Sequence, residues 1–65
     1  MFSWRYIVQD RESGLFLGFE EGDVAPVRLI KQAVQFDSPE SAVMTAIQSC
    51  DSGYLVFPFL IEVAE

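Results

Sequence analysis

The chain has 65 residues, enough for one small domain over residues 1–65, whose core only just outweighs the conformational entropy lost on folding. Ten acidic and four basic residues give a net charge of -6, which repels phosphate backbones and anionic membrane surfaces, so we expect no direct nucleic-acid binding and no membrane contact. One cysteine and no histidine exclude a disulfide framework and argue against a metal site, and we expect no cofactor. No apolar run approaches the length of a membrane span and no signal peptide is visible, which predicts a soluble, cytoplasmic protein.

The first part of the chain predicts two strands joined by a hairpin. Residues 2–9 are rich in aromatic and β-branched side chains that alternate. The five polar residues that follow end in a glycine and predict a longer hairpin loop, after which residues 15–19 return as a second strand. Gly18 indicates a bulge, or a place where a bulky neighbour such as Trp4 or Tyr6 lies across the backbone.

The segment between the second strand and the helix is the hardest to assign. Residues 20–26 hold the densest negative charge and predict an exposed loop. Residues 29–36 favour a third strand because their β-branched and aromatic side chains alternate. A helical face fits part of residues 27–36 as well, so the alternative of partly helical structure stays open there.

A helix of about three turns is predicted next, because its start, period and end all agree. Ser38 is suited to accept from the first backbone N–H groups, Pro39 has a suitable fixed φ, and Glu40 complements the positive end of the helix dipole. Gly53 is expected to take the left-handed cap position after the helix. The predicted apolar face consists of Ala42, Val43, Ala46, Ile47 and Cys50.

The last element predicted is a nearly all-apolar strand over residues 54–63. Pro58 has no N–H to donate, so this strand lies at an edge, is bulged, or meets another copy at its unpaired side. The whole pattern predicts an α+β fold: a small antiparallel or mixed sheet of three to four strands with one helix packed on one face, in the order β-β-β-α-β. A single helix leaves the other sheet face without cover.

The side chains capable of chemistry do not form a catalytic pattern. Glu20, Glu21 and Asp23 are close together but lie in a glycine-containing loop without histidine, and they lack the spacing of a calcium loop, so solvation is favoured. Cys50 has no histidine to activate it and is expected to pack in the core. We therefore expect no enzyme, no catalytic residues and no metal ligands.

The aromatic side chains suggest a binding surface. Nine rings are more than a thin core needs, and in the last strand Phe57 and Phe59 face away from Tyr54 and Val56. One helix cannot cover both sets, and exposed rings are typical of protein interfaces. The acidic loop either mimics nucleic acid or serves solubility alone. The predicted partner-binding residues are Trp4, Arg5, Tyr6, Glu20, Glu21, Asp23, Phe57 and Phe59.

These features predict a non-enzymatic protein-binding module that masks a surface on a protein partner of unknown identity. Association into a homodimer is expected, since so small a domain has no disulfide or metal to stabilise it. Short, acidic, cofactor-free chains of this kind resemble in style the accessory and inhibitor proteins of bacteriophages and mobile elements, including anti-defence proteins that block a nuclease complex. The alternative is a self-associating structural or assembly subunit that uses the last strand or the open sheet face.

Overall fold

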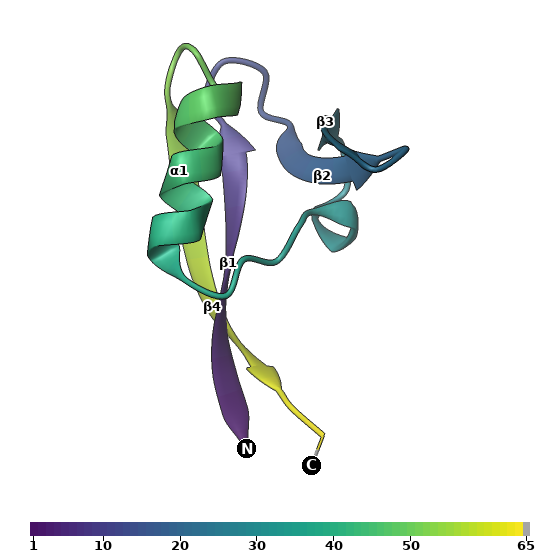
Figure 1. The fold of residues 1–65 in the computed structure, drawn as a ribbon, viewed down its shortest axis with the longest axis vertical. Helices are drawn as coiled ribbons and strands as arrows, with labels where there is room; N and C mark the ends of the chain where they lie inside the picture. Colours follow the sequence, from purple (N-terminus) through teal and green to yellow (C-terminus); the bar gives the residue numbers. More distant parts are fainter. Residues whose placement is uncertain (65) are drawn as a thin grey trace.

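The computed structural model describes residues 1–64, and its four strands form one sheet with a single α-helix against one face (Figure 1). The strands lie in the order β3-β2-β1-β4, and every neighbouring pair is antiparallel. The predicted fold class is therefore confirmed, with a short 3-10 turn, η1, added before the helix. The elements are β1 (Phe2–Asp10), β2 (Phe16–Glu20), β3 (Asp23–Val27), η1 (Ile30–Gln32), α1 (Pro39–Ser49) and β4 (Tyr54–Glu62).

Helix α1 begins as its sequence predicts. The Ser38 hydroxyl oxygen accepts from the Ser41 backbone N–H at 3.2 Å, and a proline occupies the first helical position. The helix ends at Ser49. Cys50 is its C-cap: the Cys50 N–H donates to the Ala46 carbonyl at 2.8 Å, while the Cys50 backbone is already extended. The expectation that Gly53 caps the helix is wrong: its φ is +112°, but it lies in the turn that leads into β4.

The core lies between α1 and the sheet. Ala42, Ala46 and Cys50, spaced by four residues, form the contact line, and the small alanines let the helix approach the strands closely. The sequence pattern places Ile47 on this face, but Ile47 is 63% exposed, because it follows Ala46 by one residue and so lies about 100° further round the helix. The buried core residues are Val8, Leu17, Ala42, Ala46 and Cys50, with Tyr6, Phe36, Tyr54 and Val56 packed against them.

The third strand lies earlier in the chain than the sequence indicated, at Asp23–Val27 instead of residues 29–36. Glu21 and Gly22 have φ values of +54° and +81°, so they form the two-residue type of turn that suits the twist of a hairpin. Pro26 is tolerated because β3 is an outer strand. The carbonyl of Leu17, which is opposite Pro26, bonds away from β3, so the proline nitrogen points outward from the sheet.

The segment after η1 fills a gap between two diverging strands. β1 and β2 are in register only at Gln9 and Phe16, and below that point residues 33–36 lie between them. Val34 donates to the Leu17 carbonyl at 2.9 Å, and Tyr6 and Phe36 exchange two backbone hydrogen bonds of 3.0 and 2.7 Å. These residues therefore satisfy backbone groups on both strands without forming a strand of their own.

Gly18 is the position where this segment comes closest to the sheet. A Cβ atom built there would lie 2.8 Å from the Gln32 carbonyl oxygen and 2.8 Å from a methyl group of Val27. The predicted close approach is therefore confirmed, although the neighbours are Gln32 and Val27 and not Trp4 or Tyr6. Only glycine leaves room for η1 to pack on β2.

The sheet face opposite α1, called here the open face, is partly covered by the chain itself. Ile7 on this face is only 3% exposed, with Ile30 of η1 among its neighbours. The expectation that this face has no cover is therefore wrong at its centre, because the segment around η1 folds back over it. Along β4 the open face remains accessible: Leu55 and Phe57 are 44% and 41% exposed.

The lower halves of β1 and β4 extend beyond the rest of the molecule as a two-stranded ribbon (Figure 1). We define this ribbon as residues 2–5 and 59–62. The molecule measures 38 × 23 × 18 Å, and the ribbon lies along its long axis, past the start of α1. Its side chains are largely exposed, including Phe2, Trp4 and Leu60 on the α1 side. An isolated two-stranded ribbon is marginally stable in water, so this part depends on the body of the domain.

Candidate protein-binding surface

The open face holds an apolar hollow between β4 and η1, called here the open-face pocket. It has a volume of about 350 Å³. Ile7 is directly opposite Phe57 in the β1–β4 register, so these two side chains are neighbours on the same face. Phe57 and Ile30 remain 41% and 61% exposed around the buried Ile7. The pocket is lined by Ile7, Ile30, Gln35, Phe57, Pro58 and Phe59.

Arg5 lies on the same face, next to Phe59 in register. Its guanidinium donates to the Ser3 hydroxyl at 2.7 Å and to the Trp4 carbonyl at 3.1 Å, and its Nε lies 3.5 Å from the Asp37 carboxylate. The Asp37 side chain is 87% exposed, so this ion pair adds little to stability. These contacts hold the one cationic side chain of the ribbon along the open face.

The eight predicted binding residues fall in three separate places. Arg5, Phe57 and Phe59 lie together on the open face, as the alternation of the strands predicts. Trp4 and Tyr6 lie on the opposite face, where Tyr6 packs against the core under α1 and Trp4 is 53% exposed on the ribbon. The acidic residues are at the turn between β2 and β3, and none of them lines the open-face pocket.

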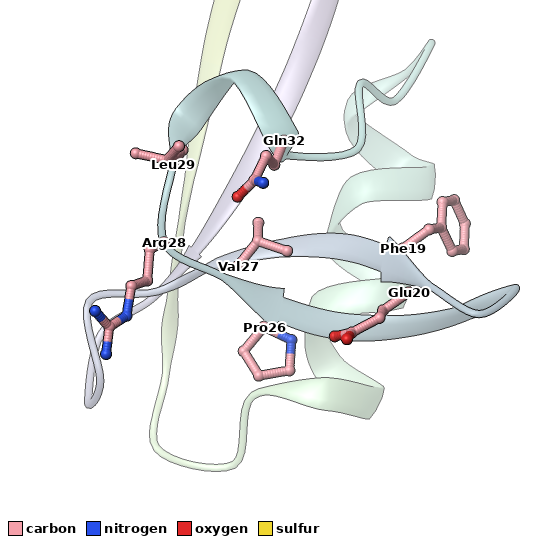
Figure 2. A pocket seen from close by; sticks show the side chains of 7 residues that line it. All are labelled: Phe19, Glu20, Pro26, Val27, Arg28, Leu29 and Gln32. Carbon is pink, nitrogen blue, oxygen red and sulfur yellow. The ribbon is translucent and has the colours of Figure 1, made fainter.

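The acidic turn lies beside a larger hollow of about 680 Å³ between the β2–β3 hairpin and η1. Figure 2 shows that its side chains do not converge: Arg28 and Phe19 point away from each other on opposite sides, and Pro26 points away from η1. Glu20 is the one carboxylate at its wall, and no group of three metal-binding side chains occurs within residues 1–64. The open-face pocket is therefore the better candidate site, because its apolar walls surround one buried residue.

Sequence reasoning missed four of the six lining residues of this pocket, Ile7, Ile30, Gln35 and Pro58, and the two isoleucines show why. The alternation of β1 places Ile7 on the face opposite Tyr6 and Val8, but that Phe57 shares this face follows only from the register between β1 and β4. Ile30 lies in the segment that fits a strand or a partly helical structure, so the sequence does not place its side chain on a face. The fold of that segment depends on Gly18, which is distant in sequence.

Cys50 is 5% exposed in the core. Burial raises the pKa of its thiol, and the nearby carboxylates of Asp10 and Asp51 raise it further. The structure thus agrees with the expectation that Cys50 packs in the core. A raised pKa keeps the thiol protonated and weakly nucleophilic at neutral pH.

This environment gives a prediction for both reactivity and pH dependence. Cys50 of the folded protein should react with iodoacetamide at least about tenfold more slowly than in 6 M urea, because the thiolate is scarce and the side chain is covered. The unfolded thiol loses its proton at lower pH than the folded one, so the free energy of unfolding should fall as pH rises above about 8.5. Urea titrations at pH 7 and 9.5 measure this fall, and a Cys50→Ala control should show less of it. Equal alkylation rates for the two states would contradict the prediction.

Comparison of the chain with protein-family models, with curated proteins and with solved structures finds no match. In the part of the chain that the structure describes, no helix is long and apolar enough to cross a membrane. The candidate surface therefore stands on its own geometry.

Proposed function

We propose that this chain is a protein-binding domain without catalytic activity, and that an apolar side chain of its protein partner enters the open-face pocket. The observation that supports this most is the arrangement of Phe57 and Ile30, which stay exposed around the buried Ile7. Binding pockets on proteins are concave and mostly apolar, with few polar groups. Here the polar side chain in the wall is the amide of Gln35, which is suited to orient a peptide group.

The size of the pocket suits one large side chain of the partner. Complete burial of a leucine or phenylalanine side chain contributes about 1.5–3 kcal/mol, which makes such a residue the main contributor to affinity. The net charge of -6 favours a partner with a basic rim around that residue and speeds their encounter. Binding should therefore weaken as the salt concentration rises.

The proposed mode of action is coverage of a partner's surface. Inhibition of the phage or mobile-element type, including the blocking of a nuclease complex, is a proposal that rests on the small size and acidity of the chain. The cytoplasm as its place of action is a proposal on the same grounds. Mimicry of nucleic acid by the acidic turn is a separate proposal, since Glu20, Glu21 and Asp23 lie apart from the pocket.

The test uses two matched variants that place a glutamate at an exposed phenylalanine. Phe57→Glu puts a charge in the wall of the open-face pocket, while Phe19→Glu puts it on the β2–β3 hairpin, where the side chain is 62% exposed. The partner captured from the native cell is identified with the unchanged protein and then titrated with each variant. We expect Phe57→Glu to weaken binding by at least tenfold and Phe19→Glu to change it less than threefold, because a charge is strongly disfavoured in an apolar contact.

Two outcomes would contradict the proposal. If Phe57→Glu binds as tightly as the unchanged protein, the pocket is not the contact. If Phe19→Glu is the variant that fails, the contact lies on the hairpin with the acidic turn. Circular dichroism and melting temperature of both variants show that a loss of binding is not a loss of folding.

A second candidate function is self-association. It is favoured by a different observation, the exposed strand edges and aromatic side chains of the ribbon. Phe2 and Trp4 of the ribbon lie on the sheet face opposite the open-face pocket and are not among its lining residues.

A further inference from the structure

The two outer edges of the ribbon differ in their ability to pair with another strand. In β4 the odd residues bond toward β1, as the Arg11 N–H to Gly53 carbonyl bond of 3.2 Å and the Val63 N–H to Met1 carbonyl bond of 2.9 Å show at its two ends. The backbone N–H and C=O groups of the even residues of β4 therefore point outward, away from β1. Pro58 lies in the middle of that outward row and has no N–H, so the row is interrupted.

The edge of β1 has an uninterrupted row of outward backbone N–H and C=O groups. Tyr6 bonds Phe36 on the side away from β4, and Asp10 donates to the Leu15 carbonyl on that same side at 2.8 Å. The backbone N–H and C=O groups of the even residues of β1 thus point toward this edge. Phe2 and Trp4 continue this row of backbone groups into the ribbon. Within residues 1–64 no backbone group pairs with them there. The Trp4 carbonyl accepts from the Arg5 guanidinium at 3.1 Å, which leaves its second lone pair available.

We propose that two copies of the chain pair antiparallel along this edge of β1, about a two-fold axis at Ser3. In this register Phe2 of one copy is opposite Trp4 of the second copy, and the reverse. Each of these two pairs exchanges two backbone hydrogen bonds, because both residues present N–H and C=O groups outward. The same register places the two exposed rings, 66% and 53% exposed, beside each other across the contact. The pairing deepens the self-association candidate named above and does not depend on the open-face pocket.

A second copy fits this edge better than an unrelated strand for two reasons. The row is self-complementary, which is the condition for a closed two-fold contact. Arg5 is the one charged side chain within residues 1–6, so in this register no two charged side chains lie directly opposite each other. The antiparallel arrangement also directs the two helix-bearing bodies to opposite ends, which keeps most of the acidic residues of the copies far apart.

The area available predicts a weak dimer. A fully buried aromatic side chain contributes about 150–250 Å², so the exposed parts of Phe2 and Trp4 supply roughly 250 Å² per copy. Stable interfaces bury about 1,200–2,000 Å² in total, and this contact is smaller. We therefore expect a dissociation constant of about 10–1000 µM, in the range of transient complexes.

The test compares two single N-methyl groups on the backbone, which are accessible by chemical synthesis of a chain of this length. N-methylation of Trp4 removes an outward donor from the β1 edge, and N-methylation of Leu60 removes one from the β4 edge. Sedimentation equilibrium from about 10 µM to 2 mM covers the expected range of dissociation constants. Trp4 is the only tryptophan, so its fluorescence reports the same contact directly. We expect the Trp4 methyl group to raise the dissociation constant at least tenfold and the Leu60 methyl group to change it less than threefold.

Three outcomes would overturn the proposed pairing, and they can be distinguished from one another. A monomer throughout this range would exclude the pairing. A larger effect at Leu60 than at Trp4 would move the contact to β4. A Phe57→Glu variant that is monomeric would place self-association on the open face, whereas loss of partner capture with an intact dimer concerns the proposed function alone.

Discussion

Replacement of Val8 by alanine should lower the free energy of unfolding by about 2–3 kcal/mol, because it leaves a cavity at a site that cannot collapse easily. Val8 is 0% exposed and is the largest fully buried side chain among the described residues. It lies on a central strand of the sheet, under α1, with Ala42 and Ala46 in the same core cluster. The alanines carry no longer side chain that could move into the space.

The effect should be large relative to the total stability of so small a domain. A loss of this size corresponds to a fall in melting temperature of roughly 10–20 °C for 65 residues. Thermal unfolding followed by circular dichroism measures it. The matched control is Val24→Ala on the outer strand β3, where the side chain is 36% exposed, and there we expect a loss below about 1 kcal/mol. Equal losses at the two positions would contradict the packing described.

Replacement of Gly18 by alanine is expected to destabilise the protein by about 1–3 kcal/mol through overpacking. The new Cβ would lie 2.8 Å from the backbone oxygen of Gln32, and that oxygen cannot move without shifting η1. The segment that fills the gap between β1 and β2 should loosen as a result. Hydrogen exchange should show this as faster exchange of the Val34 N–H, which bonds the Leu17 carbonyl in the native protein.

Gly22 provides the control for this substitution. Its φ is +81° and no atom lies within 4 Å of a Cβ built there, so backbone conformation alone restricts it. Asparagine tolerates this conformation, and Gly22→Asn should cost less than about 1 kcal/mol. Gly18→Asn should cost at least as much as Gly18→Ala. If both asparagine variants were equally stable, close packing at Gly18 would not be the reason for its glycine.

The fold class could be predicted because several elements have strong local signals. The alternation in β1, the Ser38-Pro39 start of α1 and the apolar run of β4 each depend on neighbouring residues only. Pro58 predicts an edge strand, a bulge or a contact with another copy, and in the structure β4 is an outer strand of the sheet.

The assignment of β3 failed because two signals competed. The negative charge of residues 20–26 indicates a loop, whereas in the structure Glu21 and Gly22 adopt the positive φ values of a two-residue hairpin turn. The alternation of residues 29–36 then suggested a strand. In the structure residues 30–32 form η1, and residues 33–36 pair first with β2 and then with β1, which lie far away in the sequence.

Part of the candidate site could be predicted, because the period of a strand is a local signal. The common face of Phe57 and Phe59 follows from the period of a strand. The same period places the consecutive residues Trp4 and Arg5 on opposite faces, so they cannot belong to one binding surface. The cover over Ile7 could not be predicted, because it requires the tertiary position of η1.

Both outer strands of the sheet carry a proline whose nitrogen faces away from the neighbouring strand, Pro26 in β3 and Pro58 in β4. A β-sheet with two receptive margins could add copies without limit and grow into fibrils. With a proline at each margin, such growth lacks a hydrogen bond at every junction. This chain, in which about half the residues are hydrophobic, is therefore expected not to grow into fibrils through β3 and β4, and the dimer proposed above uses the β1 edge instead.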